Sequence, residues 1–125
     1  MNTFDDIARK TANVQGLDRI SAEERSKLQL RQPHLPRDYI RFLAEIGTGD
    51  LGGIRLFGGP TASSEIYPNG EQALTTVLLF GDDFQGYCFG FDTADGYRVV
   101  EVDPRGRIDR AVESDFVEFV SQYLN

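Results

Sequence analysis

The sequence predicts a single α+β domain, with N-terminal helices, a central antiparallel β-meander sheet, and a C-terminal helix packed on one sheet face. Before about residue 47, apolar residues recur at helical spacing, and after about residue 52 short β-rich runs alternate with turn sequences. Helical spacing returns near the C-terminus, and helices gathered at both ends of a run of strands are typical of α+β layers. No linker divides the 125 residues, so we expect one domain over residues 1–125 with its core at about 21–125.

Three helices are expected before the sheet. Apolar residues within 4–12 follow the i, i+3, i+4, i+7 pattern of one helical face. Ser21 and Glu24 form a capping-box sequence that should start a second helix, ending before Pro33. Proline is favoured in the first turn of a helix, where its missing N–H would have no partner, so a third helix is expected over about 36–46.

The strands are expected from β-branched and aromatic residues between turn signals. The turns are predicted at 81–86, 93–96 and 103–106, all rich in Asp and Gly. Residues 116–124 return to helical spacing, with Ser114 as the expected cap. The expected strands are Ile54–Phe57, Glu65–Tyr67, Leu74–Phe80, Tyr87–Phe91 and Tyr97–Val102.

Charge is distributed unevenly and bears on the choice of partner. The chain carries a net charge of −7, and residues 61–125 hold 12 Asp/Glu against 4 Lys/Arg. An acidic half repels nucleic acid and anionic membrane surfaces, so neither is expected as a partner, and a basic protein is favoured. An acidic surface that only maintains solubility is the alternative reading. No segment reads as a membrane span or a signal peptide, so we expect a cytoplasmic protein.

Few residues could support catalysis or bind a cofactor. Cys88 and His34 are the only cysteine and histidine, and Cys88 lies between two aromatic residues of an expected strand, where a thiol is usually a buried apolar group. We therefore expect no enzyme, no zinc site and no cofactor. The glycines of 47–52 match the dinucleotide fingerprint letter by letter, but they follow a helix and precede a strand, which is the reverse of the real motif.

The acidic turns are the remaining candidates for a site. Their spacing does not fit an EF-hand, since the positions 3 and 5 counted from Asp92 are Ala94 and Gly96. Turn chemistry alone explains Asp at these positions, and a partner-facing acidic edge is the functional alternative. Phe84 within the first loop either folds back onto the core or is exposed as an interface anchor. The predicted partner-binding residues are Asp82, Asp83, Phe84, Gln85, Asp92 and Asp95.

Several segments, in order, resemble the SMI1/KNR4 (SUKH) superfamily. The stretch 35–43 runs Leu-Pro-Arg-Asp-Tyr-Ile-Arg-Phe-Leu and is followed by glycines 47 and 49. Residues 79–83 and 86–92 resemble the strand, acidic-glycine loop and aromatic-x-aromatic-Asp strand of that family, and 99–103 resembles its next strand. Residues 114–120 resemble its closing helix. The chain differs from many relatives in lacking tryptophan and the Asn-Gly-Gly turn.

The resemblance implies an α+β domain that binds proteins. Many bacterial members of the superfamily are immunity proteins that neutralise polymorphic toxins, often nucleases, by direct binding. Fungal relatives are regulatory and scaffold proteins, so the fold does not decide between these roles. The expected function is therefore a non-catalytic immunity protein for a basic toxin domain, with a regulatory or scaffold module as the alternative.

Overall fold

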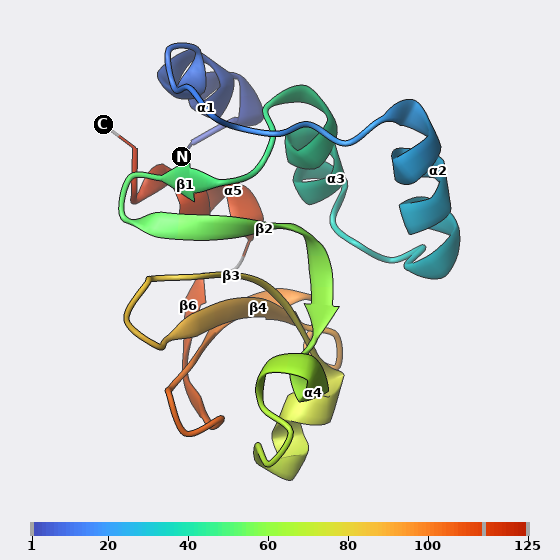
Figure 1. Cartoon of the computed structure of the whole chain (residues 1–125), viewed down its shortest axis with the longest axis vertical. Coiled ribbons are helices and arrows are strands. Elements are labelled where there is room, and N and C mark those ends of the chain that lie inside the picture. The colour runs from blue at the N-terminus through green and yellow to red at the C-terminus, as the bar shows by residue number, and fades with distance from the viewer. Residues whose placement is uncertain (1, 114, 125) are drawn as a thin grey trace.

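Six strands form one antiparallel sheet in the order β1-β2-β3-β4-β5-β6 (Figure 1). The computed structural model describes residues 2–113 and 115–124. Each strand pairs with the one before it, which confirms the predicted meander and places successive turns at alternate ends of the sheet. The strands are β1 (Asp50–Leu51), β2 (Ile54–Ala62), β3 (Val77–Asp82), β4 (Cys88–Asp92), β5 (Arg98–Val102) and β6 (Ile108–Glu113).

The helix starts follow the capping signals in the sequence. The Ser21 hydroxyl accepts from the Glu24 N–H at 3.0 Å, and the Glu24 carboxylate accepts from the Ser21 N–H at 2.9 Å, which confirms the capping box. Asp115 caps the C-terminal helix, while the expected cap Ser114 lies outside the described residues. No described helix is long and apolar enough to cross a bilayer. The main helices are α1 (Phe4–Thr11), α2 (Ala22–Arg31), α3 (Arg37–Glu45) and α5 (Phe116–Ser121).

Several elements differ from the sequence expectation. Strand β1 was not expected, and β2 continues to Ala62, beyond the predicted end at Phe57. The strand expected at Glu65–Tyr67 is wrong: this segment belongs to the short helix α4 (Ser63–Ile66) and the residue after it. The first part of the expected strand Leu74–Phe80 is the 3-10 helix η1 (Gln72–Thr76). Strand β6 was not expected, because it is a largely polar edge strand whose pattern lacks a buried face.

Helices α1, α3 and α5 cover one face of the sheet (Figure 1). The centre of this core is aromatic: the Tyr39 ring lies 5.1 Å from the rings of Phe91 and Phe116, in edge-on contacts. Phe4 and Ile7 of α1 are buried in the same cluster. The core therefore includes α1, whereas the sequence placed its beginning at about residue 21.

A second, smaller core lies on the other sheet face. It consists of Leu74, Val77, Leu79, Cys88, Val100 and Val102. The segment formed by α4 and η1 lies at this side, and the Ser63 hydroxyl donates to the Leu74 carbonyl at 2.6 Å, joining the two elements. This second layer explains why residues 63–76 do not form a strand: their apolar side chains cover the sheet instead of extending it.

Candidate functional site: the β3–β4 turn

The structure divides the six predicted site residues between opposite ends of β4. Asp82 pairs with Cys88 at one end of the β3–β4 hairpin, and Val77 pairs with Asp92 at the other. A strand rises about 3.4 Å per residue, so the two ends of β4 lie roughly 14 Å apart. A single acidic edge containing all six residues is therefore wrong, because consecutive turns of a meander alternate between the ends of the sheet.

Asp92 and Asp95 shape the β4–β5 turn. The Asp92 carboxylate accepts from the Thr76 hydroxyl at 2.8 Å and from the Ala94 N–H at 3.0 Å. Asp95 lies 4.0 Å from Arg98 in an exposed ion pair. These contacts give both carboxylates a local structural role. They favour the interpretation that Asp is present here to shape the turn, over a partner-facing acidic edge.

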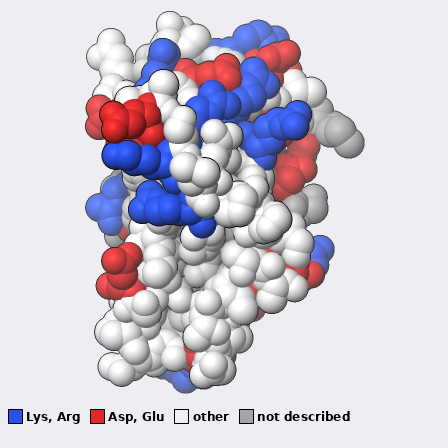
Figure 2. Space-filling view, turned by 90° about the vertical axis from the view of Figure 1, so that its right-hand side faces the viewer, with Lys and Arg blue, Asp and Glu red and all other residues white. Residues whose placement is uncertain are grey.

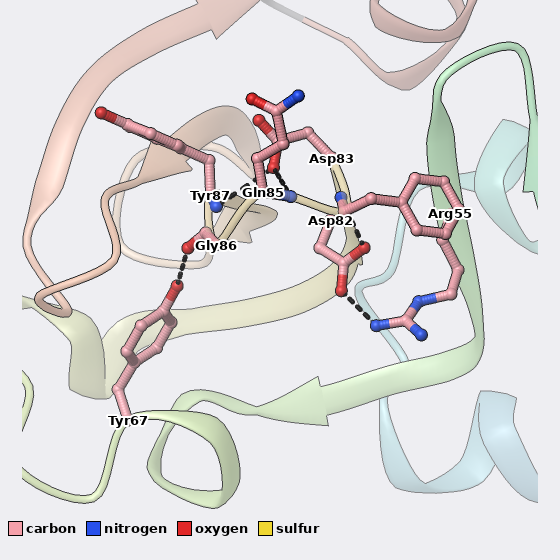
Figure 3. A network of polar contacts seen from close by, with 8 residues as sticks. Arg55, Tyr67, Asp82, Asp83, Gln85, Gly86 and Tyr87 are labelled. Atoms are coloured by element: carbon pink, nitrogen blue, oxygen red, sulfur yellow. Dashed lines mark hydrogen bonds and ion pairs between the residues drawn. The ribbon is translucent and has the colours of Figure 1, made fainter.

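Residues 82–85 lie together at the other end and form the β3–β4 turn. One Asp83 oxygen accepts from the N–H groups of Gln85 and Tyr87, at 2.8 and 3.2 Å (Figure 3). One Asp82 oxygen accepts from the Phe84 N–H at 3.2 Å. Side-chain acceptors that satisfy turn amides restrict the backbone, so this loop is held in a defined conformation.

Two residues distant in sequence brace the turn. The second Asp82 oxygen pairs with the Arg55 guanidinium of β2 at 2.5 Å, and the Tyr67 hydroxyl donates to the Gly86 carbonyl at 3.3 Å (Figure 3). Burial raises the pKa of Tyr67, so its hydroxyl stays protonated and able to donate at neutral pH. Sequence reasoning missed both residues because only strand pairing and the fold of 63–76 bring them here.

Phe84 is the exposed apolar residue of this turn. Its side chain is 53% exposed, and its backbone has a φ of +67°, in the left-handed region that a bulky residue rarely adopts. The Arg55 guanidinium carbon lies 5.6 Å from the centre of the Phe84 ring. The ring is therefore not folded onto the core, which excludes the first of the two alternatives left open by the sequence.

The β5–β6 turn joins the β3–β4 turn at the same end of the sheet. A Cβ atom added to Gly86 would lie 3.2 Å from Pro104, so the two loops are in contact. The β5–β6 turn carries both acidic and basic side chains. The Asp103 carboxylate accepts from the backbone N–H groups of Arg105 and Arg107, whose side chains are exposed. The site is therefore an aromatic turn with mixed charges around it, and not a purely acidic edge.

A partly buried carboxylate lies close by on β5. Glu101 faces Arg110 across the β5–β6 pair at 3.7 Å. Burial raises its pKa, and the neighbouring Asp109 and Asp83 add to this shift, while Arg110 opposes it.

The residues that could support catalysis or metal binding lie outside the β3–β4 turn. Cys88 is buried in the second core, and burial raises the pKa of its thiol, which keeps it in the protonated, weakly nucleophilic form. His34 is exposed in the loop between α2 and α3. Within the described residues, no group of three His, Cys, Asp or Glu side chains could hold a metal ion.

Together, the fold and this turn define an α+β domain that presents a preorganised aromatic loop at one end of its sheet. A scan against protein-family models, a search of curated proteins and a search of solved structures find no match for the chain. The resemblance to the SMI1/KNR4 superfamily therefore rests on the sequence motifs alone.

Proposed function

We propose that this chain is a non-catalytic protein-binding domain of the SMI1/KNR4 type, and that it acts as an immunity protein that neutralises a toxin by direct binding. The observation that carries protein binding is Phe84, a half-exposed aromatic on a strained backbone in a turn braced by Arg55 and Tyr67. Strain at an exposed position persists where it serves recognition, and aromatic anchors are the usual hot spots of interfaces.

The bracing of the turn supports binding through preorganisation. A flexible loop loses conformational entropy when a partner immobilises it, and this loss subtracts from the affinity. The bonds from Asp82, Asp83 and Tyr67 hold the turn before any partner arrives. The role of immunity protein is supported by the family resemblance, and a basic toxin surface is supported by the excess of 12 Asp/Glu over 4 Lys/Arg in residues 61–125.

Binding kinetics with a toxin domain found encoded beside this gene test the proposal. We expect Phe84→Ala to raise the off-rate by about 30-fold, as loss of a hot spot of about 2 kcal/mol would. The double variant Asp82→Asn, Asp83→Asn keeps one side-chain oxygen at each position for the turn amides but removes two charges and the pairing of Asp82 with Arg55. It should lower the on-rate at low salt and lose this effect as salt rises.

The matched control makes the same charge change at the other end of β4. The double variant Asp92→Asn, Asp95→Asn should leave the off-rate as in the wild type and change the on-rate less than the turn variant does. Wild-type off-rates for Phe84→Ala would place the interface elsewhere. Absence of a toxin gene nearby, together with capture of an intracellular partner that needs Phe84, would favour the regulatory role.

A further inference from the structure

A second surface lies on α2, away from the β3–β4 turn. Helix α2 stands at the outer edge of the molecule, on the right in Figure 1, with α3 between it and α5. Of its ten residues, Leu28 alone is buried. Because residues two apart in a helix point about 200° from each other, Leu30 faces directly away from the core, and its side chain is 84% exposed.

Shallow grooves run along both flanks of α2, and each is bordered by cations. The groove toward α3 has a volume of about 380 Å³, and Pro33, Leu35 and Ile40 form its apolar part, with Arg25 and Arg37 beside them. The groove toward β2 has a volume of about 160 Å³, and its charged lining residues are Lys27, Arg31 and Glu24. Ile20, Leu28 and residues 58–60 complete it. Leu30 therefore lies on the crest between two grooves that combine apolar and charged side chains.

The segment that carries this face has an excess of cations, unlike the whole chain, although Lys27 and Arg41 are paired with Glu23 and Glu45. Residues 19–41 hold six Lys/Arg against three Asp/Glu, a local net charge of +3 in a chain of −7. Figure 2 shows Lys and Arg gathered over the upper part of this side, with Asp and Glu side chains among them, whereas the lower part is mostly uncharged. Arg31 and Arg37 make no ion pair within 4.0 Å among the described residues, so their charges are available to a partner.

We propose that the outer face of α2, with Leu30 at its crest, docks an acidic amphipathic segment of another protein. Apolar side chains of that segment would cover Leu30 and enter the flanking grooves, while its carboxylates would pair with Arg31 and Arg37. A protein is favoured over nucleic acid because Glu23, Glu24 and Asp38 are interspersed among the cations and no aromatic side chain is exposed on α2 for base stacking.

This surface is independent of the proposed toxin site and has the opposite preference in charge. Weak burial also suits α2 to recognition, since elements with few buried contacts are free to adjust on binding. A chain with one site for a basic protein and another for an acidic segment can hold two partners at once.

The test uses a fluorescent synthetic peptide of roughly 14 residues, with leucine and phenylalanine at i, i+3, i+4 and i+7 spacing among glutamates. Binding to the full chain is followed by fluorescence anisotropy, and the site is located from amide shifts in NMR spectra. We expect a dissociation constant on the order of 10–100 μM, with shifts centred on α2 and the start of α3. Leu30→Ala should weaken binding about 3- to 10-fold, and the double variant Arg31→Glu, Arg37→Glu by at least about 10-fold.

The control reverses two exposed cations at the distant β5–β6 turn. The double variant Arg105→Glu, Arg107→Glu changes the net charge equally and should bind the peptide within about twofold of the wild type. Equal binding of a lysine-substituted peptide, or no effect of Leu30→Ala, would overturn the proposal. Tighter binding of a single-stranded RNA, or a dimer in sedimentation that Leu30→Ala abolishes, would overturn it in favour of that occupant. Phe84→Ala should leave the peptide affinity unchanged, so the two proposals can fail separately.

Discussion

At the scale of single residues, Phe84 combines a ring that stays half exposed with a backbone in the left-handed region. This conformation destabilises the isolated domain, since it costs about 1–2 kcal/mol for a residue with a Cβ atom. The β3–β4 turn could have closed with glycine at this position. The cost is explained if Phe84 contributes to binding, which stability measurements can separate from folding.

We expect Phe84→Gly to leave the free energy of unfolding unchanged or to raise it by up to about 1 kcal/mol. Glycine removes the strain at a positive φ but adds conformational freedom to the unfolded chain. Gln85→Gly is the control in the same loop, because its backbone φ is not positive; it should lower the free energy of unfolding by about 0.5–1 kcal/mol. Urea unfolding of both variants measures the difference, and a larger loss for Phe84→Gly than for Gln85→Gly would show that the ring supports the fold.

Tyr39 has a polar hydroxyl group inside the apolar core. Its hydroxyl is buried without a hydrogen-bond partner among the described residues, and burial raises its pKa, so it stays neutral. An unsatisfied buried polar group costs about 1–3 kcal/mol. We therefore expect Tyr39→Phe to raise the free energy of unfolding by about 1 kcal/mol in chemical denaturation. Destabilisation by this substitution would show that the hydroxyl forms a bond that the described structure does not contain.

At the scale of elements, α5 and α2 differ in how much of each helix is buried. Helix α5 buries four of its six residues, and the ring of Phe119 contacts those of Phe80, Phe89 and Tyr123. Helix α2 buries one residue of ten and depends on its capping box. Helix α5 therefore contributes to the core, and α2 contributes chiefly to the surface.

Paired substitutions in these two helices test that distinction. Phe119→Ala should lower the free energy of unfolding by about 3–5 kcal/mol, as a large-to-small change in a packed core does. Leu30→Ala removes an apolar side chain at an exposed position and should change the free energy of unfolding by less than about 0.5 kcal/mol. Guanidinium unfolding checks both. A loss below about 1 kcal/mol for Phe119→Ala would contradict the packing of α5 on the sheet.

At the scale of the whole molecule, one carboxylate joins the two ends of the chain. Glu118 of α5 accepts from the backbone N–H of Asn2 at 2.7 Å and from its side-chain amide at 3.3 Å. The bonds from Asn2 hold the pKa of Glu118 below its ordinary value of 4.5. Because the folded pKa is lowered, this contribution to stability is present above about pH 4.5 and is lost as the pH falls through the folded value.

We expect Glu118→Gln to be less stable than the wild type at pH 7, with the difference shrinking as the pH falls below 4.5. Glu101→Gln is the opposite case: the pKa of Glu101 is raised, so its ionisation opposes folding above its ordinary value of 4.5. The stability of Glu101→Gln should therefore increase relative to that of the wild type as the pH rises. Thermal unfolding across pH 3–7 measures both trends, and parallel pH profiles of wild type and Glu118→Gln would contradict the link between the termini.

Local rules predicted much of the fold. The capping box at Ser21, the helical spacing of 116–124 and the Asp/Gly turns depend on contacts within a few residues, so the sequence alone specifies them. The second core layer and edge strand β6 were not predictable in this way. Residues 63–76 and 108–113 depend on long-range neighbours: the first covers a sheet face, and the second pairs with β5 on one side only.

The same division applies to the candidate site. The carboxylates and the aromatic of the turn at 81–86 could be predicted from the sequence, because turn residues and composition are local properties. The exposure of Phe84, the bracing by Arg55 and Tyr67, and the position of Asp92 and Asp95 at the far end of β4 depend on the folded chain. The physical reason is strand pairing: an antiparallel register sends neighbouring turns to opposite ends of the sheet and brings distant segments into contact.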